Sequence, residues 1–185
     1  MRPSTVTSYI HPGGEIGVLV EVGCESELVT KSDRFQEFVH DIAMQIAASG
    51  PKFIRKEHVS GKVLDQERER YRLEAAATGK RGPVVAKIVE GKVHKYYEEV
   101  CLYQRPFIKD RSISISQLIA SRVAELGEEI RVRRFARLKV GESNLTMASD
   151  SDPGPQDGEE TGVPVNRPKA PKGGIGFAVA KPGAE

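Results

Sequence analysis

The segment from Thr5 to Asp33 constrains the fold most strongly, because it reads as a β-hairpin that leads into a buried strand. Its two extended runs, Thr5–Ile10 and Ile16–Val22, flank the turn sequence His-Pro-Gly-Gly. Proline presets φ in such a turn, the paired glycines adopt positive φ, and the flanks alternate with a period of two. One face of the second run carries only β-branched residues: Ile16, Val18, Val20 and Val22. This strand should therefore lie against a core, and residues 25–29 should form a short loop after it, where binding residues often occur.

Four helices are expected after this loop, at about residues 32–49, 63–78, 83–102 and 114–126. Ser32 or Thr30 caps the first helix, and Gly50 ends it. Ser114 and Gln117 form a capping box for the last. The second helix is charged and should be peripheral. The third carries a broad apolar stripe and should pack over the sheet.

A final strand is expected at residues 130–140, with one largely apolar face and one largely basic face. The apolar face comprises Ile130, Val132, Ala136, Leu138 and Val140, interrupted by Arg134. The other face comprises Arg131, Arg133, Phe135, Arg137 and Lys139. Strands at both ends with helices between them predict an α+β fold, with a small antiparallel sheet of about three strands packed with about four helices.

The chain changes character at Ser143, so we expect a core domain at residues 1–142 and a disordered tail at 143–185. The tail holds six of the eleven prolines and seven of the eighteen glycines, with Phe177 as its single aromatic residue. Such a composition buries too little apolar surface to offset chain entropy. Gly173–Ala180 is its most apolar piece, either inert or a short docking segment. We expect no membrane span, because no apolar run approaches about 20 residues.

The residue types that usually carry catalysis are present but scattered. The four histidines fall at positions 11, 40, 58 and 94, without Cys or His neighbours at metal-ligand spacing. The glycine pairs match neither phosphate-binding loop pattern. Cys24 and Cys101 fit small buried residues in a reducing compartment, with a disulfide or a dimer contact as the alternatives. We therefore expect no metal, no cofactor and no side-chain catalysis.

The basic strand face at residues 131–139 leaves several interpretations open. It fits a solvated strand face, an acidic protein partner, ribosomal RNA or a dimer seam around Phe135. The net charge of the whole chain is only +2, and the face lacks interleaved aromatic residues for base stacking. We therefore expect no nucleic-acid partner.

Two separated segments resemble the core domain of translation elongation factor Ts, most closely its short cyanobacterial and plastid forms. The first is YIHPGGEIGVLVEVGCE, followed by the helix FQEFVHDIAMQIA. The second is RPFIKDRSISISQLIASRVAELGEEIRVRRFARLKVGE. They occur in the family's order and spacing, and the resemblance covers roughly residues 4–142. It implies a nucleotide exchange factor, which binds the GTPase elongation factor Tu and promotes GDP release during protein synthesis.

The resemblance also implies where the GTPase would be contacted. The family carries a wedge of sequence Thr-Asp-Phe-Val directly after a Cys-Glu pair at the end of the second strand. The matching residues here are Ser26, Glu27, Leu28 and Val29. Glu27 keeps the carboxylate on a longer side chain, and Leu28 replaces the aromatic ring. The alternative is that Leu28 and Val29 tuck under the following helix.

The family also implies a small helical domain ahead of the core, resembling a ubiquitin-associated fold. Met1 lies only a few residues before the first strand, so we expect this domain to be absent. The chain is then either a shortened form or a divergent relative with weaker exchange. The alternative function is a non-exchanging binding or scaffold protein of the translation apparatus. Single-core forms of the family pair through their sheets, which implies a homodimer. The expected compartment is a plastid or mitochondrion in a eukaryote and otherwise the bacterial cytoplasm.

Overall fold

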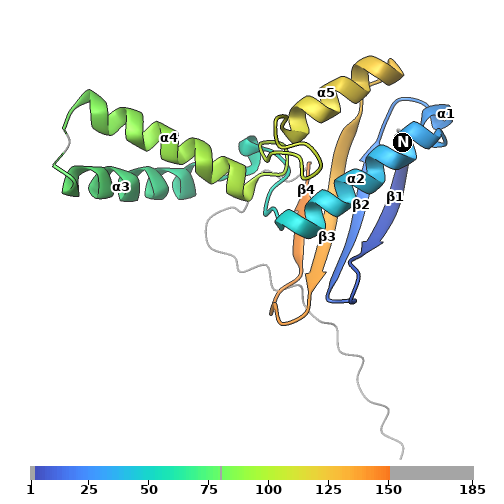
Figure 1. The fold of residues 1–185 in the computed structure, drawn as a ribbon, viewed down its shortest axis with the longest axis horizontal. Coiled ribbons are helices and arrows are strands. Elements are labelled where there is room, and N and C mark those ends of the chain that lie inside the picture. The colour runs from blue at the N-terminus through green and yellow to red at the C-terminus, as the bar shows by residue number, and fades with distance from the viewer. Residues whose placement is uncertain (1–2, 80, 151–185) are drawn as a thin grey trace, which may run out of the picture.

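The computed structural model describes residues 3–79 and 81–150 of the 185-residue chain. These residues form one antiparallel sheet with α-helices packed on it and beside it (Figure 1). The strands are β1 (Ser4–Ile10), β2 (Ile16–Gly23), β3 (Arg131–Lys139) and β4 (Thr146–Ser149). The helices are α1 (Glu27–Thr30), α2 (Asp33–Ser49), α3 (Gly61–Ala77), α4 (Pro83–Val100) and α5 (Ile115–Leu126), with a 3-10 turn at Lys56–His58. The predicted α+β class is confirmed, with one strand more than expected.

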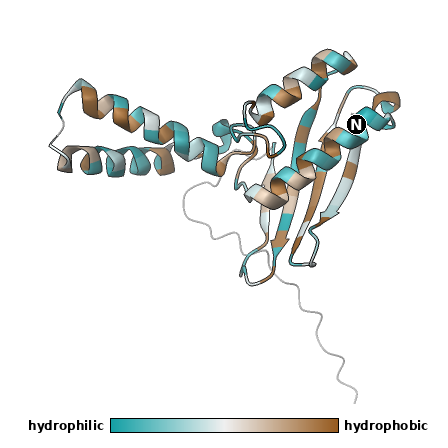
Figure 2. Cartoon of the chain, viewed as in Figure 1, coloured by the Kyte–Doolittle hydropathy of each residue, from teal (hydrophilic) through white to brown (hydrophobic). Residues whose placement is uncertain are grey.

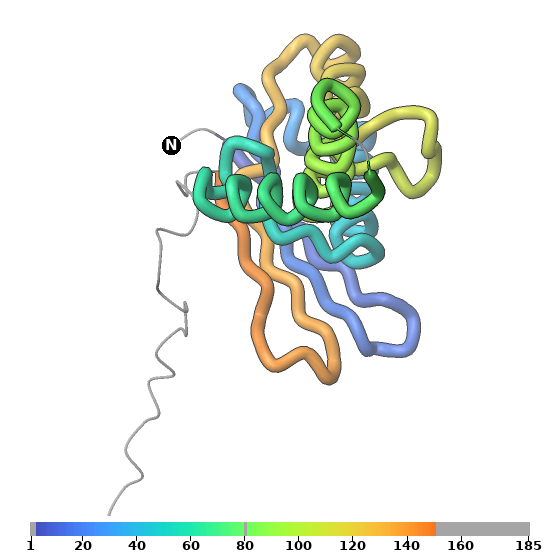
Figure 3. The backbone as a smooth tube through the Cα atoms, turned by 90° about the vertical axis from the view of Figure 1, so that its left-hand side faces the viewer, coloured from blue at the N-terminus to red at the C-terminus, as the bar shows by residue number. Residues whose placement is uncertain are grey.

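The four strands lie side by side in the order β1-β2-β3-β4 (Figure 3). The predicted hairpin between β1 and β2 is confirmed. Its turn closes through a hydrogen bond of 2.9 Å from the His11 N–H to the Ile16 carbonyl. Gly13 and Gly14 adopt φ of 100° and 74°, a region that side chains disfavour. The turn chemistry therefore sets the register of the hairpin.

The main core lies between one face of the sheet and the helices α2 and α5 (Figure 1). Figure 2 shows hydrophobic and hydrophilic residues alternating along these elements, as one buried face requires. The strands contribute Val18, Val20, Val22, Val132 and Phe135. The two helices contribute Phe35, Phe38, Val39, Ile42, Ala43, Ile46, Ala47, Ile115, Leu118 and Ile119. The caps predicted for these helices are confirmed at Ser32 and at Ser114, where Gln117 completes the capping box.

A β-bulge interrupts the pairing of β2 with β3. Glu21 pairs with Arg134 and Val22 pairs with Val132, so Arg133 is an extra residue on β3. Because side chains alternate from face to face along a strand, one extra residue exchanges the two faces for everything that follows.

The facing predicted for the second half of β3 is therefore wrong. Phe135, expected on the exposed face, is 3% exposed and belongs to the core. Arg137 is also buried, donates to the Ala47 carbonyl near the end of α2 and pairs with Glu142 at 2.9 Å. Leu138, expected in the core, is 60% exposed.

The helices α3 and α4 form a hairpin that projects away from the sheet (Figures 1 and 3). The expectation that α4 packs over the sheet is wrong, because its apolar stripe is covered by α3 instead. The contacting residues are Tyr71, Val89 and Val93, with Leu64, Val85 and Tyr97 around them. The peripheral position expected for α3 is shared by both helices.

The sheet continues past residue 142, where the sequence predicted a disordered tail. The short strand β4 pairs with β3 from Arg134 to Arg137. Asp150 follows it, donates its N–H to the Arg133 carbonyl and accepts an ion pair from Arg55 at 2.8 Å. Residues 146–150 are thus held by the neighbouring strand β3 and by Arg55, which lies 95 residues away from Asp150. The rest of the predicted tail, including Gly173–Ala180, lies outside the described residues.

Both cysteines, Cys24 and Cys101, are buried and free. Burial raises the pKa of the Cys101 thiol to about 12, with a smaller contribution from the Glu57 carboxylate. Among residues 3–79 and 81–150, no helix is both long and apolar enough to traverse a bilayer.

Candidate partner-binding site

The four residues predicted to contact a partner lie where β2 leads into α2, at one end of the sheet (Figure 1). The sequence predicted a loop for residues 25–29. In the structure, residues 27–30 instead form the single helical turn α1, with Ser26 as its N-cap. A helix this short has little stability of its own, so its conformation depends on the groups around it.

Ser26 is held from both sides. Its hydroxyl accepts a hydrogen bond of 3.3 Å from the Val29 N–H, which caps α1. Its own N–H donates to Glu128 Oε2 at 2.9 Å, and its hydroxyl donates to Glu128 Oε1. These hydrogen bonds lower the pKa of the Glu128 carboxyl, chiefly through the Ser26 hydroxyl. Glu128 is therefore a charged acceptor at neutral pH.

Glu27 and Leu28 both face solvent. Leu28 is 84% exposed, the highest value among the large apolar side chains that the structure describes. Glu27 pairs with Lys31 one turn later at 2.8 Å, and this pair lowers the pKa of the Glu27 carboxyl. Both charged side chains are exposed, so the pair contributes little to stability. Leu28 therefore offers an uncovered apolar contact beside a carboxylate.

The C-terminal half of α1 faces the protein instead. Val29 is partly buried and packs against the main core. Thr30 is buried, and its carbonyl accepts a hydrogen bond of 2.5 Å from the Gln36 side chain on α2. Of the two residues that the alternative interpretation placed under the helix, Val29 thus packs inward whereas Leu28 does not. The inward-facing residues Val29 and Thr30 thus anchor the turn, whereas Leu28 projects from it into solvent.

Sequence reasoning did not identify Glu128. It lies 102 residues from Ser26 in the chain, in the connection between α5 and β3. Its local pattern, two glutamates after a helix-ending glycine, resembles any solvated helix end. Neither segment carries a local sequence pattern that predicts the contact between Ser26 and Glu128, because only the fold brings these two residues together.

The predicted basic strand face does not form. Arg137 is buried, as described above, and the bulge separates Arg131 and Arg133 from the positions that follow. Arg131 pairs with Glu129, and Lys139 lies 3.9 Å from Glu142. The positive charges of Arg131, Arg137 and Lys139 thus each lie beside a carboxylate, rather than in one continuous basic stripe.

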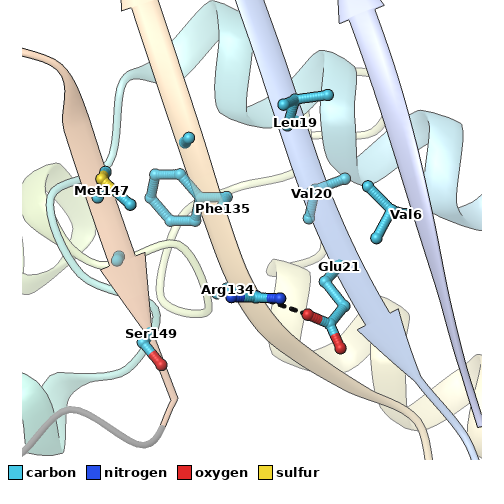
Figure 4. Close-up of a pocket in the computed structure, with 10 residues that line it drawn as sticks. Val6, Leu19, Val20, Glu21, Arg134, Phe135, Met147 and Ser149 are labelled. Carbon is cyan, nitrogen blue, oxygen red and sulfur yellow. Dashed lines mark hydrogen bonds and ion pairs between the residues drawn. The ribbon is translucent and has the colours of Figure 1, made fainter. Parts of the chain in front are cut away.

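The sheet face opposite α2 and α5 carries a shallow apolar groove of about 470 Å³. Figure 4 shows Val6, Leu19 and Met147 around it, with Glu21 hydrogen-bonded to Arg134 at its end. The large apolar side chains exposed on this face are Val6, Ile10, Leu19, Leu138 and Met147. An uncovered apolar sheet face of this kind is typical of an interaction surface.

In the part of the chain that the structure describes, no three His, Cys, Asp or Glu residues are grouped to hold an ion. His58 approaches Asp150 at 3.7 Å, but this pair belongs to the Arg55 contact that holds the end of β4.

Comparison with known proteins places the chain among translation factors. The family model described as "Elongation factor TS" matches residues 2–142. Elongation factor Ts of Koribacter versatilis is 58% identical over 144 residues, which cover 78% of this chain and 66% of that protein. Elongation factor Ts of Solibacter usitatus is 48% identical over 152 residues, covering 82% and 72%. Elongation factor Ts of Carboxydothermus hydrogenoformans is 48% identical over 145 residues, covering 78% and 67%. The chain thus spans about two thirds of the length of these bacterial relatives.

Proposed function

Since the chain belongs to the elongation factor Ts family, we propose that it binds the GTPase elongation factor Tu and promotes GDP release during translation elongation. The observation that carries this proposal is Leu28, which projects into solvent from a braced turn at the position of the family's wedge. The proposal concerns binding rather than covalent chemistry, so it needs no general acid, general base or metal ion.

The proposed mechanism is differential affinity. A protein that binds the nucleotide-free GTPase more tightly than the GDP-bound form must, by linkage, weaken GDP binding by the same factor. Leu28 supplies apolar surface for insertion into the GTPase, and Glu27 supplies a carboxylate next to it. Both are accessible without rearrangement of the core, because the rest of α1 anchors the turn. Their insertion would displace groups that hold the nucleotide.

A non-exchanging scaffold protein is the alternative function. The observation that favours it is the side chain at position 28, where a leucine stands in place of the aromatic ring of the family's wedge. A smaller wedge fills a ring-shaped pocket less completely. Such a protein would still bind the GTPase without accelerating GDP release.

We also propose that a second copy of the chain packs on the open sheet face. The exposed apolar residues around the groove support this, together with the sheet pairing implied by the family resemblance. Phe135, which the sequence placed at the seam, is buried in the core. The dimer seam is instead assigned to Leu19, Leu138 and Met147.

The bacterial relatives favour the bacterial cytoplasm over an organelle as the compartment.

The test is the rate at which fluorescent GDP leaves elongation factor Tu of a bacterial relative, with and without this chain. Accelerated release supports an exchange factor. Co-elution of the two proteins without acceleration supports the scaffold function. If neither is observed, both proposals fail.

A further inference from the structure

Glu128 lies in the α5–β3 connection, where it contacts the N-cap residue of the exposed turn α1. Gly127, directly before it, ends α5 in the left-handed conformation with φ of 71°. This glycine turns the chain out of the helix, so that the next side chain points toward the end of β2. Both oxygens of the Glu128 carboxylate then accept hydrogen bonds from the single residue Ser26.

The hydrogen bonds between Glu128 and Ser26 also restrain α1, because Ser26 is its N-cap. Its N–H and O–H are directed at Glu128, which orients the hydroxyl oxygen to accept from the Val29 N–H. Its carbonyl accepts from the Cys24 thiol at 3.0 Å, which fixes the same residue from the end of β2. A continuous chain of hydrogen bonds thus runs from Glu128 through Ser26 to Val29, and it holds the turn that carries Leu28.

The two ends of α1 are held by different means. The C-terminal end is fixed by the packing of Val29 on the core and by the hydrogen bond from Gln36 to Thr30. The N-terminal end depends on the hydrogen bonds of Ser26. Without the Glu128 carboxylate, the Ser26 donors would turn to water, and the first residues of the turn would gain freedom.

We propose that Glu128 is a positioning residue for partner binding: it acts through Ser26 to hold Leu28 in its binding geometry before the partner arrives. The inference rests on the proposed exchange function. Ordering a loop in advance increases affinity, because the conformational entropy is then not lost during binding. Glu128 itself is occupied by Ser26 and has no need to contact the GTPase.

The variant that tests this is Glu128→Gln, which keeps the side-chain size and replaces one acceptor oxygen with a donor nitrogen. The matched control is Glu129→Gln, which removes the same charge one residue later, from a side chain that pairs with Arg131. We expect Glu128→Gln to lower the rate of GDP release at subsaturating chain concentration by about tenfold, the effect of losing roughly one charge-assisted hydrogen bond. Glu129→Gln should leave the rate unchanged.

Two further readouts separate positioning from a general structural role. In a Leu28→Ala background, Glu128→Gln should reduce GDP release much less than in the parent chain, because its influence passes mainly through Leu28. The Val29 amide, which donates to Ser26, should exchange with solvent faster in Glu128→Gln than in the parent chain. An unchanged release rate, or a full additional loss in the Leu28→Ala background, would overturn the proposal.

The amide-exchange measurement uses the chain without any GTPase, so it is independent of the proposed function. If the Val29 amide keeps its protection from solvent exchange in Glu128→Gln, the positioning role is overturned, even if the parent chain accelerates GDP release. If the parent chain does not accelerate GDP release from elongation factor Tu, the proposed function is overturned. The exchange rate of the Val29 amide still decides whether Glu128 stabilises α1.

Discussion

Leu28 and Val29 are neighbours in the same helical turn, yet Leu28 is 84% exposed whereas Val29 packs against the main core. A free leucine side chain normally reduces its contact with water where the chain allows it. Here the buried neighbour and the capped N-terminus of α1 prevent this. The turn therefore holds an apolar side chain in solvent, where a partner can reach it.

Replacing Leu28 by Phe should increase GDP release, because a ring matches the aromatic residue of the family's wedge. We expect a gain of about fivefold, corresponding to about 1 kcal/mol from the added aromatic contact. The melting temperature should hardly change, since the side chain makes few contacts in the free chain. Leu73→Phe on α3, at a leucine that is 63% exposed, is the control. Equal rates for Leu28→Phe and the parent chain would count against a wedge role.

The Ser26–Glu128 contact should weaken in acid. The pKa of Glu128 is lowered in the folded protein, so the contact stabilises the fold fully above the unfolded value of about 4.5. This stabilisation is lost as the pH falls through the lower, folded pKa. Exchange of the Val29 amide, corrected for its intrinsic pH dependence, should therefore lose protection below about pH 4.5. A profile identical to that of Glu128→Gln would show that the carboxylate is not the titrating group.

If a second copy covers the open sheet face, Leu19→Glu should abolish the dimer. Leu19 is 53% exposed at the groove, so a charge there would be desolvated only in the dimer. At about tens of micromolar, a concentration near the dissociation constant of a weak interface of standard size, sedimentation of the parent chain should still show a dimer. The variant should sediment as a monomer at the same concentration. Leu73→Glu on the α3–α4 hairpin is the control. A monomeric parent chain at that concentration contradicts the assignment.

The order of β4 should depend on Asp150. Its side chain is 17% exposed and pairs with Arg55, so Asp150→Asn removes a partly buried ion pair. We expect a local destabilisation of about 1–2 kcal/mol, seen as faster amide exchange at residues 146–149. The core amides of α2 should keep their protection. Equal loss of protection in β4 and α2 would show that the pair supports the whole fold rather than this strand.

The locally encoded parts of the fold could be predicted from the sequence. The turn at Gly13 and Gly14, the cap at Ser32 and the capping box at Ser114 each depend on residues within about four positions of one another. The candidate turn at residues 26–29 was located by its resemblance to the family. Its role in binding stays a prediction, although the structure shows which of its side chains are accessible.

The exchanged strand faces, the covering of α4 and the contact of Glu128 all depend on pairing between separate elements of the fold. The bulge at Arg133 appears only when β3 pairs with β2, and it exchanged the predicted faces of Phe135 and Leu138. The apolar stripe of α4 fits a sheet or another helix equally well, and only the fold shows that α3 covers it. Glu128 has no local signal at all, since its partner lies 102 residues away.

We propose that the chain accelerates GDP release from elongation factor Tu chiefly through Leu28. The most direct measurement compares GDP release from elongation factor Tu in the presence of the parent chain, Leu28→Ala and the control Leu73→Ala. We predict that Leu28→Ala loses at least about tenfold of the acceleration, as expected for a central apolar contact. Leu73→Ala should match the parent chain. Equal acceleration by the parent chain and Leu28→Ala would show that Leu28 does not drive GDP release.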